Sequence, residues 1–163
     1  APSSVLWLLD CNPWAKSNLQ HEAEKAGVAA NRIVFAPRVP IAEHLARHAH
    51  ADLFLDTQPY NAHTTASDAL FMGVPVLTIL GNTFASRVAA SLLTRAGLPE
   101  LISKNLQEYE QKAVFFAQHP ERLAELNHAQ NKSPLFDANQ FARDIEQQYL
   151  NTWAKLDTST KLP

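Results

Sequence analysis

Short apolar runs alternate with helix-patterned segments along the first part of the chain, and this alternation constrains the fold most. Four runs have the length and composition of strands: Ser4–Leu9, Arg32–Phe35, Ala51–Leu55 and Pro75–Leu80. Each is followed by a segment with helical spacing of apolar residues, at positions 15–26, 41–48, 64–72 and, after a turn at Gly81, up to about 95. Such alternation is typical of a doubly wound parallel sheet, so we predict an α/β protein with a Rossmann-like sheet whose first run is buried on both faces.

The pattern changes beyond Glu100, where we expect helices and no further strands. The expected helices cover Ser103–Ala117, Pro120 to about Gln130, and Phe136–Trp153. The last one carries Phe141, Ile145, Tyr149 and Trp153 at four-residue spacing, which is typical of a docking face. Residues 157–163 have no periodicity and are predicted to form a loose tail.

Composition narrows the functional class. The chain has 163 residues, is 46% hydrophobic and carries a net charge of −2, which fits one domain core and argues against a nucleic-acid or anionic-membrane surface. The single cysteine, Cys11, forms no intramolecular disulfide and fits a reducing, cytoplasmic compartment. No apolar run approaches the roughly 20 residues that span a bilayer, and Val5–Leu9 is too short for a signal peptide. Because the chain opens almost directly on a strand, it reads like a piece of a longer protein.

The polar stretch from Asp56 to Asp68 separates the third predicted strand from the next helix. A helix N-terminus binds anions through its free N–H groups and the positive end of its dipole. Here it is surrounded by hydroxyl and imidazole donors, namely His63, Thr64, Thr65 and Ser67. Asp68 lies four residues after Thr64, on the same helical face, where it can accept from a sugar hydroxyl. The stretch indicates a nucleotide-diphosphate site; the alternative is that Thr64 or Thr65 is an ordinary N-cap.

Three polar loops should meet at the carboxyl edge of the sheet, where open α/β folds bind ligands. They are residues 36–44, 56–68 and 81–87. None has the glycine-rich fingerprint of NAD-binding or P-loop proteins. In these loops we expect Asp56 to shape the backbone by local hydrogen bonds, Arg87 to make a structural pairing, and Tyr60 to pack.

Three motifs together carry a family resemblance. They are Arg32-Ile-Val-Phe-Ala-Pro with Pro40-Ile-Ala-Glu-His44, Leu55-Asp-Thr with Asn61-Ala-His-Thr-Thr-Ala-Ser-Asp68, and Thr83-Phe-Ala-Ser-Arg-Val-Ala-Ala-Ser91. The set resembles the C-terminal lobe of the O-linked N-acetylglucosamine transferases and their Spindly-type relatives, glycosyltransferase family 41. The resemblance covers most of positions 3–155 in unchanged order.

The resemblance implies the second, nucleotide-sugar-binding lobe of a GT-B glycosyltransferase over residues 1–156, with its C-terminal helices at 103–156. By position, His44 matches the histidine that packs on uracil, Arg47 an arginine near the base, and the Val39 backbone the segment that reads the uracil edge. The residues around the predicted helix start also match. His63 matches the position beside the sugar and phosphate and is the one candidate for a catalytic contact. Thr64 and Thr65 match the pair that cradles the diphosphate, and Asp68 matches the carboxylate that holds the ribose.

Two departures from the family pattern stand out. Ile41 occupies the position of a lysine that contacts the ribose in many members. The family's diphosphate-binding lysine, its first strand and helix, its catalytic N-terminal lobe and any tetratricopeptide repeats all match positions before Ala1. We therefore expect Ser4–Leu9 to present an unpaired apolar edge that favours self-association.

The implied reaction moves N-acetylglucosamine from UDP-N-acetylglucosamine to a serine or threonine of a protein acceptor, which other parts of the parent chain bind. The residues require no metal or cofactor. The alternatives are a Spindly-type protein O-fucosyltransferase that uses GDP-fucose, a non-catalytic interaction module that docks through the helices after Glu100, and a GT-B-shaped UDP-sugar 2-epimerase.

Overall fold

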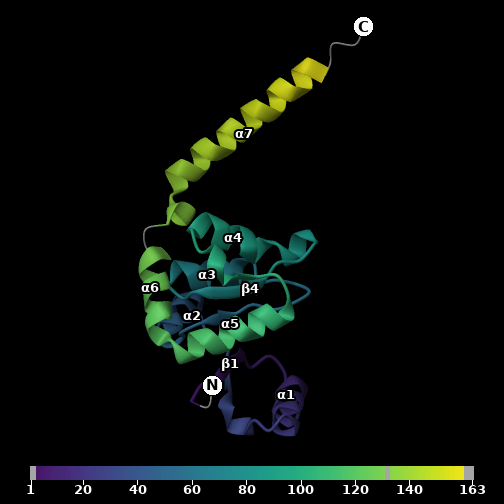
Figure 1. Cartoon of the computed structure of the whole chain (residues 1–163), viewed down its shortest axis with the longest axis vertical. Helices are drawn as coiled ribbons and strands as arrows, with labels where there is room; N and C mark the ends of the chain where they lie inside the picture. Colours follow the sequence, from purple (N-terminus) through teal and green to yellow (C-terminus); the bar gives the residue numbers. More distant parts are fainter. Residues whose placement is uncertain (1–2, 131–132, 160–163) are drawn as a thin grey trace.

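The computed structural model describes residues 3–130 and 133–159 and has strands and helices in alternation (Figure 1). The strands are β1 (Leu6–Leu9), β2 (Ile33–Ala36), β3 (Phe54–Leu55), β4 (Val76–Ile79) and β5 (Ile102–Ser103). The α-helices are α1 (Pro13–Lys25), α2 (Ile41–Ala46), α3 (Thr64–Phe71), α4 (Val88–Ala96), α5 (Leu106–Gln118), α6 (Pro120–Gln130) and α7 (Ala138–Ser159). Short 3₁₀ turns, η1 to η5, cover Ala30–Arg32, Arg47–His50, Phe84–Ser86, Pro99–Leu101 and Pro134–Phe136. This order confirms the predicted α/β class.

The strands form two separate parallel pieces of sheet. Within the described residues, β1 pairs with β2 alone, and β3, β4 and β5 pair in that order. In the first piece Leu6 lies opposite Ile33, and in the second Phe54 lies opposite Val76. The usual doubly wound order is 3-2-1-4-5-6. The observed order matches it if a strand between β1 and β3 is left out.

The hydrophobic core surrounds β4. All four β4 residues are buried, and Val76, Leu77 and Thr78 have no exposed surface. Helices α3, α4 and α5 pack against this strand. They contribute the buried side chains Ala66, Ala69, Leu70, Ala89, Leu93 and Phe116, and α6 adds Leu123 and Leu126. The β3–β5 half therefore holds the main apolar core.

The β1–β2 half is much less buried, contrary to the expectation that the first strand is covered on both faces. Leu6 and Leu9 are about two-fifths exposed, and α1 has no buried residue. Ile33 is the one residue of β1 and β2 with a buried side chain. The reason is topological, since each strand of this two-stranded piece has one unpaired edge in the described residues and neither lies between two neighbours.

Local sequence explains several helix boundaries. The Asn12 side chain accepts from the N–H of Ala15 and caps α1, with Pro13 as the first helical residue. The predicted stop at Gly73 is confirmed: Gly73 follows α3 with a φ of 84°, a conformation that favours glycine. This stop allows β4 to begin three residues later, at Val76.

Two expectations for the C-terminal part were wrong. Strand β5 lies beyond Glu100, with Ile102 opposite Thr78; two residues are too short for a periodic signal. Helix α7 continues through Ser159, so the loose tail expected from Asp157 is wrong for residues 157–159, and 160–163 lie outside the described residues.

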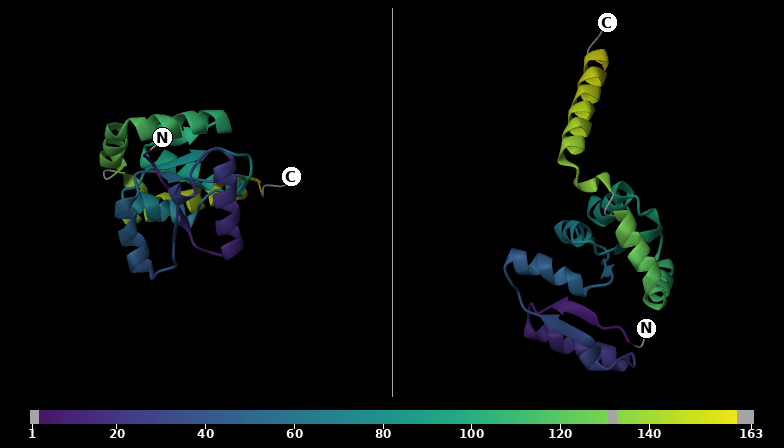
Figure 2. Two further views of the ribbon diagram at one scale, coloured as in Figure 1. Left: turned by 90° about the horizontal axis from the view of Figure 1, so that it is seen from below. Right: turned by 90° about the vertical axis from the view of Figure 1, so that its left-hand side faces the viewer.

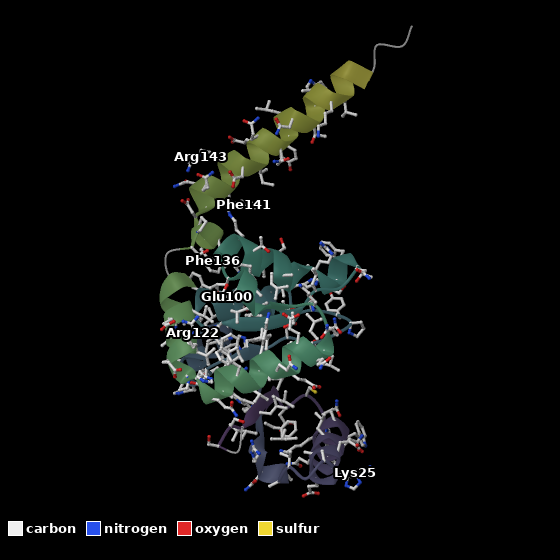
Figure 3. The ribbon with its side chains drawn as sticks, in the orientation of Figure 1. Lys25, Glu100, Arg122, Phe136, Phe141 and Arg143 are labelled. Atoms are coloured by element: carbon white, nitrogen blue, oxygen red, sulfur yellow. The ribbon has the colours of Figure 1, made fainter. Side chains whose placement is uncertain are left out.

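Helix α7 extends away from the body, on the side opposite β1 and α1 (Figures 1 and 2). Its base is fixed by an ion pair of 2.9 Å between Arg95 on α4 and Asp144. Phe136 lies where the chain enters the helix, with Phe141 just beyond it (Figure 3). The predicted aromatic stripe is exposed, with Tyr149 and Trp153 both more than 70% accessible.

Candidate functional site

A cavity of about 340 Å³ lies at the carboxyl end of β3, within the roughly 300–1,000 Å³ range of small-molecule sites. It is lined by the end of β3, the following turn and the start of α3: Phe54, Leu55, Asp56, Thr57, Tyr60, Asn61, Ala62, His63 and Thr65. Two of the residues predicted to bind the ligand, His63 and Thr65, are among them. Part of the stretch from Asp56 to Asp68 thus lines a cavity at the sheet edge, whereas Thr64 and Asp68 are not among its lining residues.

Helix α3 begins at this cavity without a side-chain cap. Its N-cap residue is His63, and no side chain bonds to the first-turn N–H groups. The alternative that Thr64 or Thr65 is the N-cap is therefore wrong. Both threonines are exposed, and the structure gives neither hydroxyl a hydrogen-bond partner in the described part of the chain. The first turn of α3 is free to bind an anion.

His63 is held between two aromatic side chains. Its ring stacks on Tyr60 with centroids 4.8 Å apart and meets Phe84 edge-on at 5.8 Å. Its Nε2 lies 3.3 Å from the carbonyl oxygen of Ala85. Tyr60 was expected to pack, and it does so against His63, but it is 63% exposed and also forms part of the cavity wall.

A second group of predicted residues lies on α2 and the turn that follows it. Arg47 donates to Nδ1 of His44 at 2.8 Å and to the Pro37 carbonyl at 3.0 Å, and its guanidinium lies 5.5 Å from the Trp7 ring centroid. His48 is buried, and its ring meets that of His44 edge-on at 4.9 Å. His44 is thus held in place on two sides.

Burial lowers the pKa of His44 from its ordinary value of 6.5, and the charge of Arg47 and the His48 ring lower it further. The Asp68 carboxylate acts in the opposite direction, which places α3 within electrostatic reach of α2. Both His44 and Asp68 are half-buried. The Val39 backbone lies in the segment between β2 and α2. Neither His44, Arg47 nor Val39 lines the cavity, so the predicted base-binding and phosphate-binding residues occupy two neighbouring parts of the same edge.

The third polar loop supports the cavity from the β4 side. The Thr83 and Ser86 side chains form a capping box around η3, and a Cβ on Gly81 would lie 2.2 Å from the Ser86 hydroxyl oxygen. Arg87 donates to the Gly81 carbonyl at 3.1 Å, so its structural contact is with a backbone oxygen and not with a carboxylate. The loop holds Asn61 through a bond of 2.9 Å from the Asn61 N–H to the Ala85 carbonyl.

Asp56 shapes the backbone, as predicted, but the extent of its contacts was not foreseen. The side chain is 5% exposed and accepts bonds from the Thr57 and Ala62 N–H groups and from the Thr78 hydroxyl. Tyr109, on α5, donates to the Asp56 carbonyl. The signal available in the sequence was a single acidic residue at a strand end, which does not identify partners so distant along the chain.

Two classes of feature are absent from the part of the chain that the structure describes. No group of three or more His, Cys, Asp or Glu side chains is arranged to hold a metal ion. No helix in residues 3–130 and 133–159 combines the length and apolar composition needed to cross a bilayer.

Residues 1–145 match the family model described as glycosyl transferase family 41. The chain is 36% identical over 157 residues to the probable UDP-N-acetylglucosamine–peptide N-acetylglucosaminyltransferase SEC of Arabidopsis thaliana, covering 93% of this chain and 16% of that protein. It is 35% identical over 161 residues to the UDP-N-acetylglucosamine–peptide N-acetylglucosaminyltransferase of Caenorhabditis elegans, covering 96% of this chain and 14% of that protein.

A solved structure shows the same fold. The chain superposes on a K341M mutant of the Thermobaculum terrenum O-GlcNAc transferase with a TM-score of 0.85 and 33% identity, over 93% of this chain and 31% of the other. The expected fold, a Rossmann-like lobe of a GT-B protein, is confirmed by this likeness. The chain spans less than a third of the solved protein and 14–16% of the two curated relatives.

Proposed function

The chain belongs to glycosyl transferase family 41, and on that premise we propose that it forms the nucleotide-sugar-binding lobe of a protein O-linked N-acetylglucosamine transferase. In the proposed reaction a serine or threonine hydroxyl of the acceptor attacks the anomeric carbon of UDP-N-acetylglucosamine. The bond from that carbon to the diphosphate oxygen breaks, UDP leaves, and the configuration is inverted. The hydroxyl proton passes to a general base, and the rest of the parent protein binds the acceptor.

The observation that carries this proposal is the cavity at the uncapped N-terminus of α3. Negative charge develops on the departing UDP, and N–H groups and hydroxyls that already face the diphosphate stabilise it without reorganisation. We assign this role to the first turn of α3 with the hydroxyls of Thr64 and Thr65. We place His63 beside the sugar and phosphate, because it is the N-cap of α3 and lines the cavity.

The remaining part of the nucleotide is assigned to α2 and its surroundings. We propose that the His44 ring packs on uracil, that Arg47 lies near the base, and that the Val39 backbone reads the uracil edge. Asp68 accepts from the ribose hydroxyls. The Asp68 carboxylate is close enough to His44 to raise its pKa, which supports this assignment because the base and the ribose of a nucleotide are directly bonded. We propose that the reaction uses no metal or cofactor, because the N-terminus of α3 can stabilise the negative charge of the departing diphosphate.

We further propose that residues 1–156 are one lobe, with residues 103–156 as its C-terminal helices. Helices α5 and α6 pack on the core, and α7 begins at η5, against α4. We place the parent protein in the cytoplasm, where the single, exposed Cys11 would remain reduced. A contact between copies through the β1 edge is proposed from its unpaired, half-exposed leucines.

Calorimetric titration of the full-length protein with UDP, GDP and UDP-N-acetylglucosamine tests the proposal. We expect UDP and UDP-N-acetylglucosamine to bind and GDP to bind more weakly. A preference for GDP would favour the Spindly-type fucosyltransferase, and binding of none of the three would favour the interaction module. Either result would contradict the proposed function.

A further inference from the structure

The carboxylate of Asp56 closes the turn that leads into α3. Its Oδ1 accepts from the Thr57 N–H at 2.8 Å and from the Ala62 N–H at 2.6 Å, which ties the two ends of the turn to one atom. Its Oδ2 accepts from the Thr78 hydroxyl, also at 2.6 Å. Because Thr78 lies in β4, whose four residues are all buried, the carboxylate is anchored to the most deeply buried strand of the described residues.

The backbone of Asp56 is fixed as well. Its N–H donates to the Leu77 carbonyl at 3.0 Å, and its carbonyl accepts from the Tyr109 hydroxyl at 2.8 Å. Burial, with the charge of Asp56, raises the pKa of Tyr109 to about 12, so the hydroxyl keeps the proton that it donates. Asp56 is thus held by β4 and α5 at once.

The turn closed by Asp56 ends next to the anion-binding residues. Within it the Asn61 side-chain amide donates to the Thr57 carbonyl at 3.0 Å. Ala62, whose N–H bonds to the carboxylate, directly precedes His63, the N-cap of α3. The position of this N–H therefore determines where His63 and the first turn of α3 lie relative to β3.

We propose that Asp56 is a positioning residue for the diphosphate site, acting through the turn and His63 and not by contact with the nucleotide. The inference rests on the proposed function. Both of its carboxylate oxygens are already bonded within the protein, and its side chain is 5% exposed. A direct role would also be unfavourable, since a carboxylate repels a diphosphate.

This repulsion makes the inference testable. Replacing Asp56 by a neutral residue removes a negative charge near the diphosphate, which by Coulomb's law alone would strengthen UDP binding. Any selective loss of UDP affinity must therefore come from displacement of the α3 N-terminus. A purely structural role would lower the melting temperature but would leave the ratio of UDP to uridine affinity unchanged.

The experiment measures UDP and uridine affinities in the full-length protein, well below the melting temperature. In Asp56→Ala we expect the UDP-to-uridine affinity ratio to fall roughly tenfold or more, the scale of one lost bond to a charged group. Asp56→Asn keeps an acceptor for the two N–H groups and should retain most of the ratio. Asp52→Ala removes an exposed carboxylate four residues earlier and is the matched control, with an unchanged ratio.

If Asp56→Ala does not fold, Thr78→Val replaces it, because this variant keeps the volume of the buried side chain and removes only the anchor of the carboxylate. Its ratio should fall about threefold or more. An unchanged ratio in whichever of these two variants folds would overturn the inference. A wild-type protein that binds uridine as tightly as UDP would instead contradict the proposed function, so the two failures are distinguishable.

Discussion

The Arg47 guanidinium donates a hydrogen bond to Nδ1 of His44 over 2.8 Å, and this contact favours the neutral form of the ring. Arginine has no acceptor, so Nδ1 must be the acceptor and the ring proton resides on Nε2. The contact thus acts in the same direction as burial and the His48 ring, which also lower the pKa of His44. A neutral ring can pack on a base without loss of hydration of a charge.

The first prediction is that His44 titrates below its ordinary value of 6.5. Between the two pKa values the unfolded chain binds more protons than the folded one, so this group lowers stability as the pH falls below about 6.5. An NMR titration of the imidazole shifts measures the midpoint. Arg47→Met should move it toward 6.5 without reaching it, because burial is the largest cause. A wild-type midpoint at or above 6.5 would contradict the prediction.

The second prediction concerns the choice of nucleotide. His44→Ala should weaken UDP binding by about 1–2 kcal/mol, the worth of a ring stack with its buried area, and should reduce the preference for UDP over GDP. Calorimetry on the full-length protein measures both affinities, with His21→Ala on α1 as a control. Equal affinities for the two nucleotides that His44→Ala leaves unchanged would refute the assignment to uracil.

The third prediction concerns the exposed hydroxyls at the start of α3. Replacing Thr64 and Thr65 together by Val removes two donors at about 1.5–3 kcal/mol for each bond to a charged group. The loss should appear with UDP and be much smaller with uridine, which lacks phosphates. Since His63 is the N-cap, the double variant should fold normally. Equal losses for uridine and UDP would show that the pair does not bind the phosphates.

The fourth prediction concerns the distribution of stability. Leu77→Ala removes a side chain with no exposed surface from β4 and should cost about 2–5 kcal/mol. Leu19→Ala makes the same chemical change on α1, where the side chain is 43% exposed, and should cost about 0.5 kcal/mol or less. Urea denaturation of both variants measures the difference. Similar costs would mean that the β1–β2 half is packed as firmly as the core.

The fifth prediction is that the 163-residue chain, purified by itself, does not transfer sugar. It covers 14–16% of the two curated relatives, and positioning of two reactants can supply about 7–11 kcal/mol of barrier lowering. A radiolabelled transfer assay compares the chain with the full-length protein. Turnover at about a hundredth of the full-length rate would contradict the prediction, because a hundredfold loss corresponds to only about 2.7 kcal/mol of activation free energy.

The sequence was sufficient for the α/β class and for the order of the elements up to α4. Alternation of strands and helices predicted the class. The polar stretch after Leu55 lies where the structure has a cavity, and its binding of a nucleotide stays a prediction. The sequence was not sufficient for features that depend on distant partners. The hydrogen bond from Thr78 to Asp56 joins two different strands, and no local sequence pattern predicts it. Leu6 and Leu9 read as buried because their apolar run is continuous, whereas burial depends on which strands are present beside them.

The two unpaired edges of β1 and β3 restrict the symmetry of any assembly built on them. A closed two-fold dimer pairs equivalent edges, so two copies of β1 would run antiparallel across the axis. A strand that joins β1 to β3 in one doubly wound sheet must run parallel to both. Two copies of β1 paired across a two-fold axis therefore do not supply a strand that joins β1 to β3. A segment that supplies it must enter between them in the parallel direction.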